Sequence, residues 1–275
     1  MARTIQHDVR PSEYGPFMTD GFARRISEAA VTKPKLRQAV FDLIAIWRGT
    51  SCAVALPRLI PHAIADAING YEQGSKNDRS SPHRIDATLQ LLARRVPEIT
   101  DESDLRDRLR TAIEATAEEL NTVVEHLPPT KTREQVWSDY AQDASFMMGL
   151  DQTMRNGYVS VFAAYESFVT TATSIALDGE KVRVTPANAF HEKLQRAFGG
   201  KAKTIWHEEE TKTAKLVRHA MIHAGGRETD DVRTRSHGLI VDGGILYVFP
   251  ANLRRLYQHL SEGVWTIVNA KTFDD

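Results

Sequence analysis

The 275-residue sequence contains one cysteine, few strand-like segments and almost no net charge. A single cysteine, Cys52, excludes an internal disulfide bond and is compatible with a reducing compartment. The formal net charge of −1 argues against a protein that binds nucleic acid through its overall charge. With 41% hydrophobic and 26% charged residues, the composition is typical of a soluble globular protein that buries a core without disulfides.

Two further absences narrow the function. The first twenty residues have no continuous apolar stretch, and no run approaches the ~18 apolar residues of a membrane span. We therefore expect a cytoplasmic protein with no signal peptide and no membrane partner. The chain also has no GxGxxG motif and no Walker-type loop, so nucleotide hydrolysis is unsupported and no cofactor is predicted.

Helical spacing dominates the first half of the chain. A polar stretch over 72–82, rich in helix-breaking residues, predicts a loop, and Pro128-Pro129 suggests a domain boundary. We divide the chain into a helical N-terminal region of unknown role, 1–149, and a second domain, 150–275, in which the patterns are more specific. The helices predicted in the first region cover 20–48 with a break at Pro34, 57–72, 83–96, 101–127 and 131–148.

The second half gives stronger signals. Apolar residues recur at i, i+3, i+4 and i+7 over 158–177, which predicts an amphipathic helix. Further helices are expected over 186–198, 203–224 and 251–269. Two short apolar segments flank Asp242-Gly243-Gly244, which favours a β-hairpin near 238–249. The predicted fold class is therefore mainly α: a helical bundle with one small hairpin.

The helix over 203–224 has an unusual outward face. A helical wheel at about 100° per residue puts an apolar stripe on one side. The opposite side presents Arg218, His219, Ile222 and His223. Water solvates arginine and histidine well, but an exposed isoleucine among them indicates contact with another molecule, such as a second copy of the chain. The predicted core stripe consists of Trp206, Thr213, Val217, Ala220, Met221 and Ala224.

The surrounding segment is basic, although the whole chain is not. Between Lys181 and His237 there are twelve Lys or Arg and seven Asp or Glu, together with five of the ten histidines. Solvated charge is the ordinary explanation of such a segment, but it also suits a phosphate-bearing ligand. Imidazoles transfer protons near neutral pH, and a guanidinium fits phosphate. These groups suit cleavage of RNA by its own 2′-hydroxyl, in which arginine stabilises the charge on phosphorus oxygens.

Metal-dependent chemistry is a weaker alternative. His219 and His223 are four residues apart, which is the spacing of a helical two-histidine zinc site. No carboxylate or cysteine in the motif completes a ligand set, so no metal is predicted.

The stretch Arg218-His219-Ala-Met-Ile-His223, followed by Ala-Gly-Gly, resembles the motif of the HEPN superfamily of bacterial toxins and antiviral ribonucleases. That motif is an arginine, a polar residue and a histidine a few positions on. The helix "YVSVFAAYESFV" is similar to another family helix that often carries a glutamate, and Glu166 is the match; the alternative is an ordinary boundary glutamate. The resemblance covers about residues 150–268.

The resemblance implies a homodimer in which two motifs form one RNase cleft. Arg218 and His223 would then be the catalytic pair, with His219 supporting them, Glu166 orienting them and Ile222 at the dimer interface. His219 stands where the family often has Asn or Asp, which leaves its role open. In the same basic segment, Lys215 and Arg227 are predicted RNA contacts.

Two function classes remain open. The first is a metal-independent endoribonuclease, a toxin or phage-defence effector, with a possible antitoxin or regulatory protein as partner. The second is a non-catalytic helical adaptor or regulator that binds a protein or nucleotide partner through the same surface, because some HEPN domains are inactive.

Overall fold

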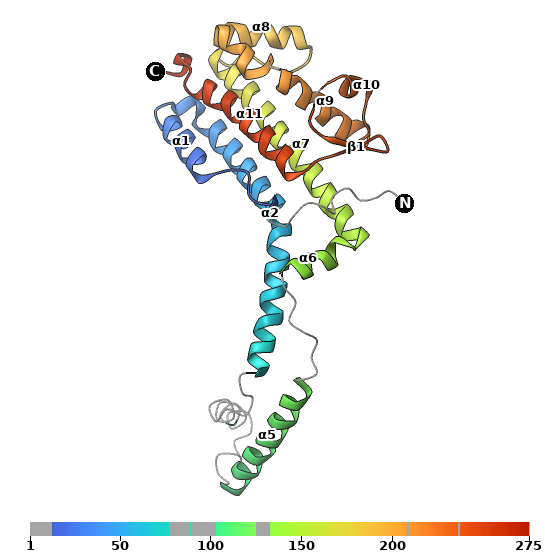
Figure 1. The fold of residues 1–275 in the computed structure, drawn as a ribbon. Helices are drawn as coiled ribbons and strands as arrows, with labels where there is room; N and C mark the ends of the chain where they lie inside the picture. Colours follow the sequence, from blue (N-terminus) through green and yellow to red (C-terminus); the bar gives the residue numbers. More distant parts are fainter. Residues whose placement is uncertain are drawn as a thin grey trace. The chain divides into compact units, whose positions relative to one another are not determined.

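The structure of the chain is a computed structural model, which describes residues 13–76, 89, 103–124, 133–207, 209–235 and 237–274. These residues are mainly helical, with one small antiparallel sheet of two strands (Figure 1). The predicted fold class is confirmed. The stretches 77–88, 90–102 and 125–132 lie outside the described residues, and with them nearly all of the predicted helix 83–96, the second part of the predicted loop 72–82 and the boundary suggested by Pro128-Pro129. The first part of that loop prediction is wrong, because residues 72–76 are helical.

The chain forms two compact units, and their limits differ from the division at residue 150. One unit contains Met1–Leu59 together with Tyr140–Asp275, and the other contains Ile60–Asp139. The long helix α2 (Pro34–Lys76) runs from the first unit into the second. The N-terminal helices up to Leu59 therefore share a core with the C-terminal part of the chain.

The first two helices show where proline does and does not interrupt a helix. Helix α1 covers Asp20–Val31 and is capped by the Thr19 hydroxyl, which accepts a hydrogen bond from the Phe22 amide at 3.3 Å. The break predicted at Pro34 is confirmed, because α2 begins there. The separate helix predicted over 57–72 is wrong: α2 continues through Pro57 and Pro61. A proline inside a helix costs about 3 kcal/mol without forbidding it, and the buried Val54 and Ala55 pack the preceding turn.

The middle of the chain is also segmented differently from the prediction. Helix α5 covers Ser103–Val124 and α6 covers Arg133–Ala141. The helix predicted over 131–148 is split, because the Asp143 side chain caps a new helix by accepting a hydrogen bond from the Phe146 amide at 2.7 Å. That helix, α7, runs without interruption over Ala144–Ala176 and includes the predicted helix 158–177 almost entirely.

The core of the larger unit forms around α7 and α11 (Pro250–Val268), which pack against each other, with α9 (Glu209–His223) against α7 and α1 against α11. The fully buried Trp47 of α2 joins this core, because its indole N–H donates to the Val161 carbonyl oxygen at 2.9 Å. Its ring also lies 5.2 Å from that of Tyr257 on α11. The N-terminal helices therefore reach the centre of the unit.

The first part of α2, Pro34–Ile60, is long and apolar enough to cross a membrane by length and composition alone. The sequence did not predict this segment as a membrane span, because Asp42 and Arg48 interrupt its apolar run. A single helix of this kind is weak evidence of a membrane span, since core helices of soluble proteins can be equally long and apolar. The only cysteine, Cys52, is exposed on this helix.

The C-terminal part confirms most of the predicted elements. Helix α8 covers Ala187–Phe198, a 3-10 turn follows over Gly199–Lys201, and the helix predicted over 203–224 begins with a π-helical turn, Lys203–His207, before α9. The predicted hairpin is present, with β1 (Ile240–Asp242) pairing antiparallel with β2 (Ile245–Tyr247) in the register Val241 opposite Leu246. A short helix, α10 (Asp230–Arg233), precedes the hairpin, and a 3-10 turn, Lys271–Phe273, follows α11.

Candidate functional site

Helix α9 ends directly after the predicted catalytic residues, and two glycines form its end. Gly225 and Gly226 have φ values of 62° and 80°, in the region that favours glycine. The Gly226 amide donates to the Ala220 carbonyl oxygen at 3.1 Å, which satisfies a terminal carbonyl of the helix. A Cβ atom on Gly226 would lie 2.6 Å from Arg155 Nη1, so any other residue here would have to displace that guanidinium.

Arg155 connects the end of α9 to two other elements. On α7 it forms an ion pair with Asp151 at 2.9 Å, and its guanidinium lies 5.7 Å from the ring centroid of Tyr247 on β2. The hairpin also bonds to the segment after the glycines, since the Leu246 amide donates to the Gly226 carbonyl oxygen at 2.8 Å. The last turn of α9 is therefore fixed by both α7 and the hairpin.

The structure brings the predicted site residues together at this end of α9. We call Glu166, Arg218, His219, Ile222 and His223 the α9 cluster. Arg218 Nη1 lies 3.3 Å from Glu166 Oε2, and the two side chains are 27% and 24% exposed. The rings of His219 and His223 lie 4.5 Å apart at 45°. Both histidines are exposed, and Ile222 is 46% exposed.

The cluster combines one restrained cation with two accessible imidazoles. A partly exposed ion pair stabilises a fold by only about 0–1 kcal/mol, so the Glu166 contact does more to orient Arg218 than to hold the helices together. Arg218 Nε is buried without a hydrogen-bond partner among the described residues. Among the described residues, the imidazoles of His219 and His223 have no hydrogen-bond partner either. The C-terminal end of α9 therefore carries two accessible proton-transfer groups and, in a separate ion pair, one cation.

The two predicted RNA contacts adjoin the cluster. Lys215 is half-buried on α9 and lies one turn before His219 on the same helix face. Arg227 is exposed directly after the glycine pair, where its backbone forms a bridge with Ile245. Within the described residues, no group of three or more His, Cys, Asp or Glu side chains is arranged to hold a metal ion.

A second polar site lies elsewhere on the same unit, and the sequence analysis did not find it. This small cavity of about 50 Å³, which we call the α11 cavity, lies among α7, α9, α11 and the segment before β1. Its polar lining includes Tyr158, Glu210, His237, Asn252, Arg255 and His259.

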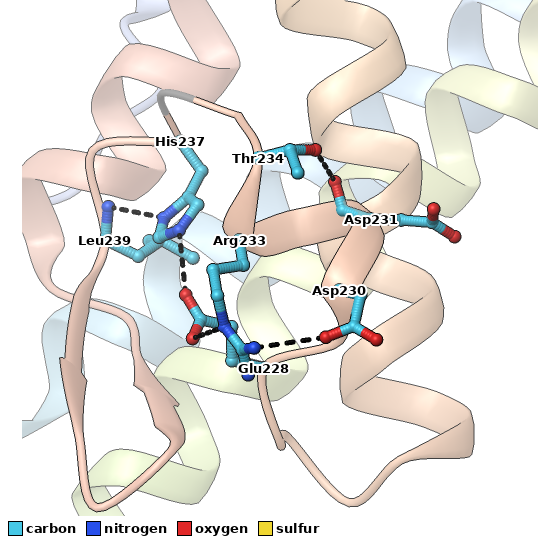
Figure 2. Close-up of polar contacts among 7 residues, drawn as sticks. All are labelled: Glu228, Asp230, Asp231, Arg233, Thr234, His237 and Leu239. Atoms are coloured by element: carbon cyan, nitrogen blue, oxygen red, sulfur yellow. Dashed lines mark hydrogen bonds and ion pairs between the residues drawn. The ribbon is translucent and has the colours of Figure 1, made fainter.

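His237 lines this cavity, and Figure 2 shows its polar contacts. Its Nδ1 accepts a hydrogen bond from the Leu239 amide at 3.1 Å, so the neutral ring has its proton on Nε2, which lies 3.7 Å from Glu228 Oε1. Glu228 also receives a hydrogen bond from Arg233 Nε at 3.2 Å. Both nitrogens of His237 are therefore engaged, and the residue serves to hold the loop.

The missed residues had a partial signal in the sequence. Arg255 and His259 are four residues apart and therefore share a face of α11. His237 is the last residue of the basic segment, and Tyr158 is the first of the apolar pattern over 158–177, so neither stands out in the sequence. No spacing rule connects Tyr158 with Arg255, because nearly a hundred residues separate them.

In comparisons with known proteins, no family model matches this chain, and neither a curated protein nor a solved structure shows significant similarity to it.

Proposed function

We propose that the protein is a metal-independent endoribonuclease of the HEPN type, whose catalytic residues are the four polar residues of the α9 cluster: Arg218, His223, His219 and Glu166. The observation that supports this most is the pair of exposed imidazoles, 4.5 Å apart, beside an arginine that a carboxylate orients. Ribonuclease chemistry by 2′-hydroxyl attack needs only these groups: a base, an acid and a cation near the phosphate.

The proposed reaction assigns one role to each group. An imidazole removes the proton of the RNA 2′-hydroxyl, and that oxygen attacks the adjacent phosphorus. The bond from phosphorus to the 5′-oxygen breaks, and an imidazolium donates the proton that the leaving oxygen takes up. Arg218 stabilises the charge on the non-bridging oxygens. His223 acts in proton transfer, and His219 supports it or supplies the second imidazole.

The proposed active form is a homodimer. Ile222 is 46% exposed on the same face as Arg218, His219 and His223, and in the proposed dimer a second copy of the chain covers it. Isologous contact would place two α9 clusters on either side of one cleft, with Lys215 and Arg227 contacting RNA. A cytoplasmic toxin or phage-defence effector, controlled by an antitoxin or regulatory protein, is the setting that we propose for such an activity.

Incubation of the purified full-length chain with total RNA in EDTA tests the proposal. We expect fragments that end in 2′,3′-cyclic phosphate, and no fragments from an Arg218→Ala, His223→Ala double variant prepared identically. RNA that stays intact with the wild-type protein, both with EDTA and with added divalent ions, would contradict the proposal.

A second candidate function is a non-catalytic adaptor that uses the same face. The exposed Ile222 supports it, because an apolar side chain on a charged surface suits any protein contact. Intact RNA together with a stable complex that Ile222→Asp abolishes would favour the adaptor.

A further inference from the structure

We propose that the α11 cavity binds an oxyanion group, a phosphate or a carboxylate, of a small-molecule ligand, with Tyr158 and Arg255 as its hydrogen-bond donors. This site is separate in its residues from the α9 cluster and does not depend on the proposed nuclease activity.

Tyr158 provides a donor without a partner. Its side chain lines the cavity and is only 6% exposed, and it has no hydrogen bond within the described part of the chain. The hydroxyl is therefore available to a ligand, and an oxyanion that accepts its hydrogen bond gains affinity. Burial raises the pKa of Tyr158, and the charge of Arg255 opposes this rise only in part. The phenol is therefore protonated at neutral pH and can donate.

Arg255 provides the charge. Among the residues described, no carboxylate pairs with its guanidinium. A glycine lets it approach the wall of the cavity: Gly238 has φ of 65°, and a Cβ atom there would lie 3.2 Å from Arg255 Nη1. The side chain of Asn252 fixes this loop, because its Nδ2 donates to the Gly238 carbonyl oxygen at 2.8 Å. Arg255 is exposed and has no competing ion pair among the described residues, and its guanidinium lies close to the Gly238 backbone.

The cavity size limits what can enter it. A volume of about 50 Å³ holds a few water molecules, and therefore one phosphate or carboxylate group but not a nucleobase. A second hollow of about 590 Å³ shares Glu210, Thr213 and Arg255 with the cavity, so the rest of a ligand has space beside its oxyanion. Glu210 has no ion-pair partner in the described part of the chain, and its carboxylate favours a ligand with a hydroxyl or amine next to the oxyanion.

Calorimetric titration of the full-length chain with inorganic phosphate and with acetate tests the proposal. We expect saturable binding of at least one probe at millimolar concentration, and the tighter probe identifies the oxyanion. Arg255→Gln should weaken binding at least about tenfold, because it removes a charged hydrogen bond. Tyr158→Phe, which keeps the ring and the fold, should weaken it about three- to tenfold.

Arg254→Gln is the matched control, since it removes one positive charge from the neighbouring position of α11. Arg254 donates instead to the Glu13 carbonyl oxygen and lines a different hollow. The affinity of the Arg254→Gln variant for phosphate and acetate should stay within about twofold of wild type. Absence of saturable binding of both probes, or equal weakening by Arg254→Gln and Arg255→Gln, would overturn the proposal.

Discussion

The two ends of α9 contribute to two different kinds of polar site. At its C-terminal end, His219 and His223 are exposed and have no partner in the described structure, while Arg218 is only partly buried. Near its N-terminal end, Glu210 lines a cavity whose donor Tyr158 is almost fully buried. Exposed imidazoles exchange protons readily with a substrate, whereas a buried phenol keeps its proton and acts only as a donor. Burial therefore separates a surface suited to catalysis from a cavity suited to binding.

The largest effect that we expect comes from His223→Ala. RNA cleavage should fall about 10²–10⁴-fold, because the variant loses a general acid–base group. The melting temperature should change little, since the His223 ring is exposed and the ring that it contacts, His219, is exposed too. Initial cleavage rates and thermal denaturation measure the two quantities.

Lys212→Ala is the control for the His223 variant, because it truncates another exposed side chain of α9, one that pairs with Glu209 at 3.0 Å. Its cleavage rate should stay near that of wild type. A His223 variant that retains more than a tenth of the wild-type rate would remove this residue from the mechanism.

The next largest effect concerns assembly. Ile222→Asp would bury an unpaired carboxylate in the proposed interface, which costs several kcal/mol and shifts a micromolar dimer to monomer. The monomer should remain folded, because Ile222 is 46% exposed on its own chain. Light scattering measures the mass, circular dichroism checks the fold, and a wild-type protein that is monomeric at high concentration would refute the interface.

Gly226→Ala should have a smaller effect, on folding. The variant must adopt φ near 80° and displace the Arg155 guanidinium, so we expect it to lower the free energy of unfolding by about 1–3 kcal/mol. Gly225→Ala is the matched control, since that glycine also has positive φ but a Cβ atom there would meet no neighbour. Denaturant titration of both variants isolates the Arg155 contact, and equal losses would show that only backbone strain matters.

The smallest stability effect is expected for Glu166→Ala. The partly exposed pair with Arg218 contributes about 0–1 kcal/mol, so the free energy of unfolding should fall by no more than that amount. Cleavage should fall more clearly, about tenfold, because Arg218 loses the carboxylate that orients it. Glu28→Ala, which removes a highly exposed pair with Arg24 at 3.9 Å, should affect neither quantity. An unchanged cleavage rate in Glu166→Ala would exclude an orienting role.

Local chemistry made much of the fold predictable. Asp242-Gly243-Gly244 specifies a tight turn through its glycines, and the hairpin is found at that point. The break before Pro34 and the end of α9 at Gly225 follow from the same backbone constraints. The proximity of Glu166 and Arg218 was expected only through a family resemblance, and the ion pair shows that the two side chains do meet.

The remaining features depend on packing between distant segments. Helix α2 continues past Pro57 and α7 is uninterrupted, although both contain residues that disfavour a helix. Neither feature can be predicted from a short segment of the sequence. The shared core of Trp47 and Val161 joins residues more than a hundred positions apart, which is why the division at residue 150 did not match the compact units. The α11 cavity was missed for the same reason, because Tyr158 and Arg255 meet only in three dimensions.

The single exposed cysteine makes the proposed assembly measurable without further engineering. A thiol-reactive spin label added to the native chain has only Cys52 to modify, and this residue is exposed on α2. A two-fold dimer contains two such labels and therefore gives one inter-label distance, whereas a monomer gives none. Mixing labelled with unlabelled protein would then report how fast the copies exchange.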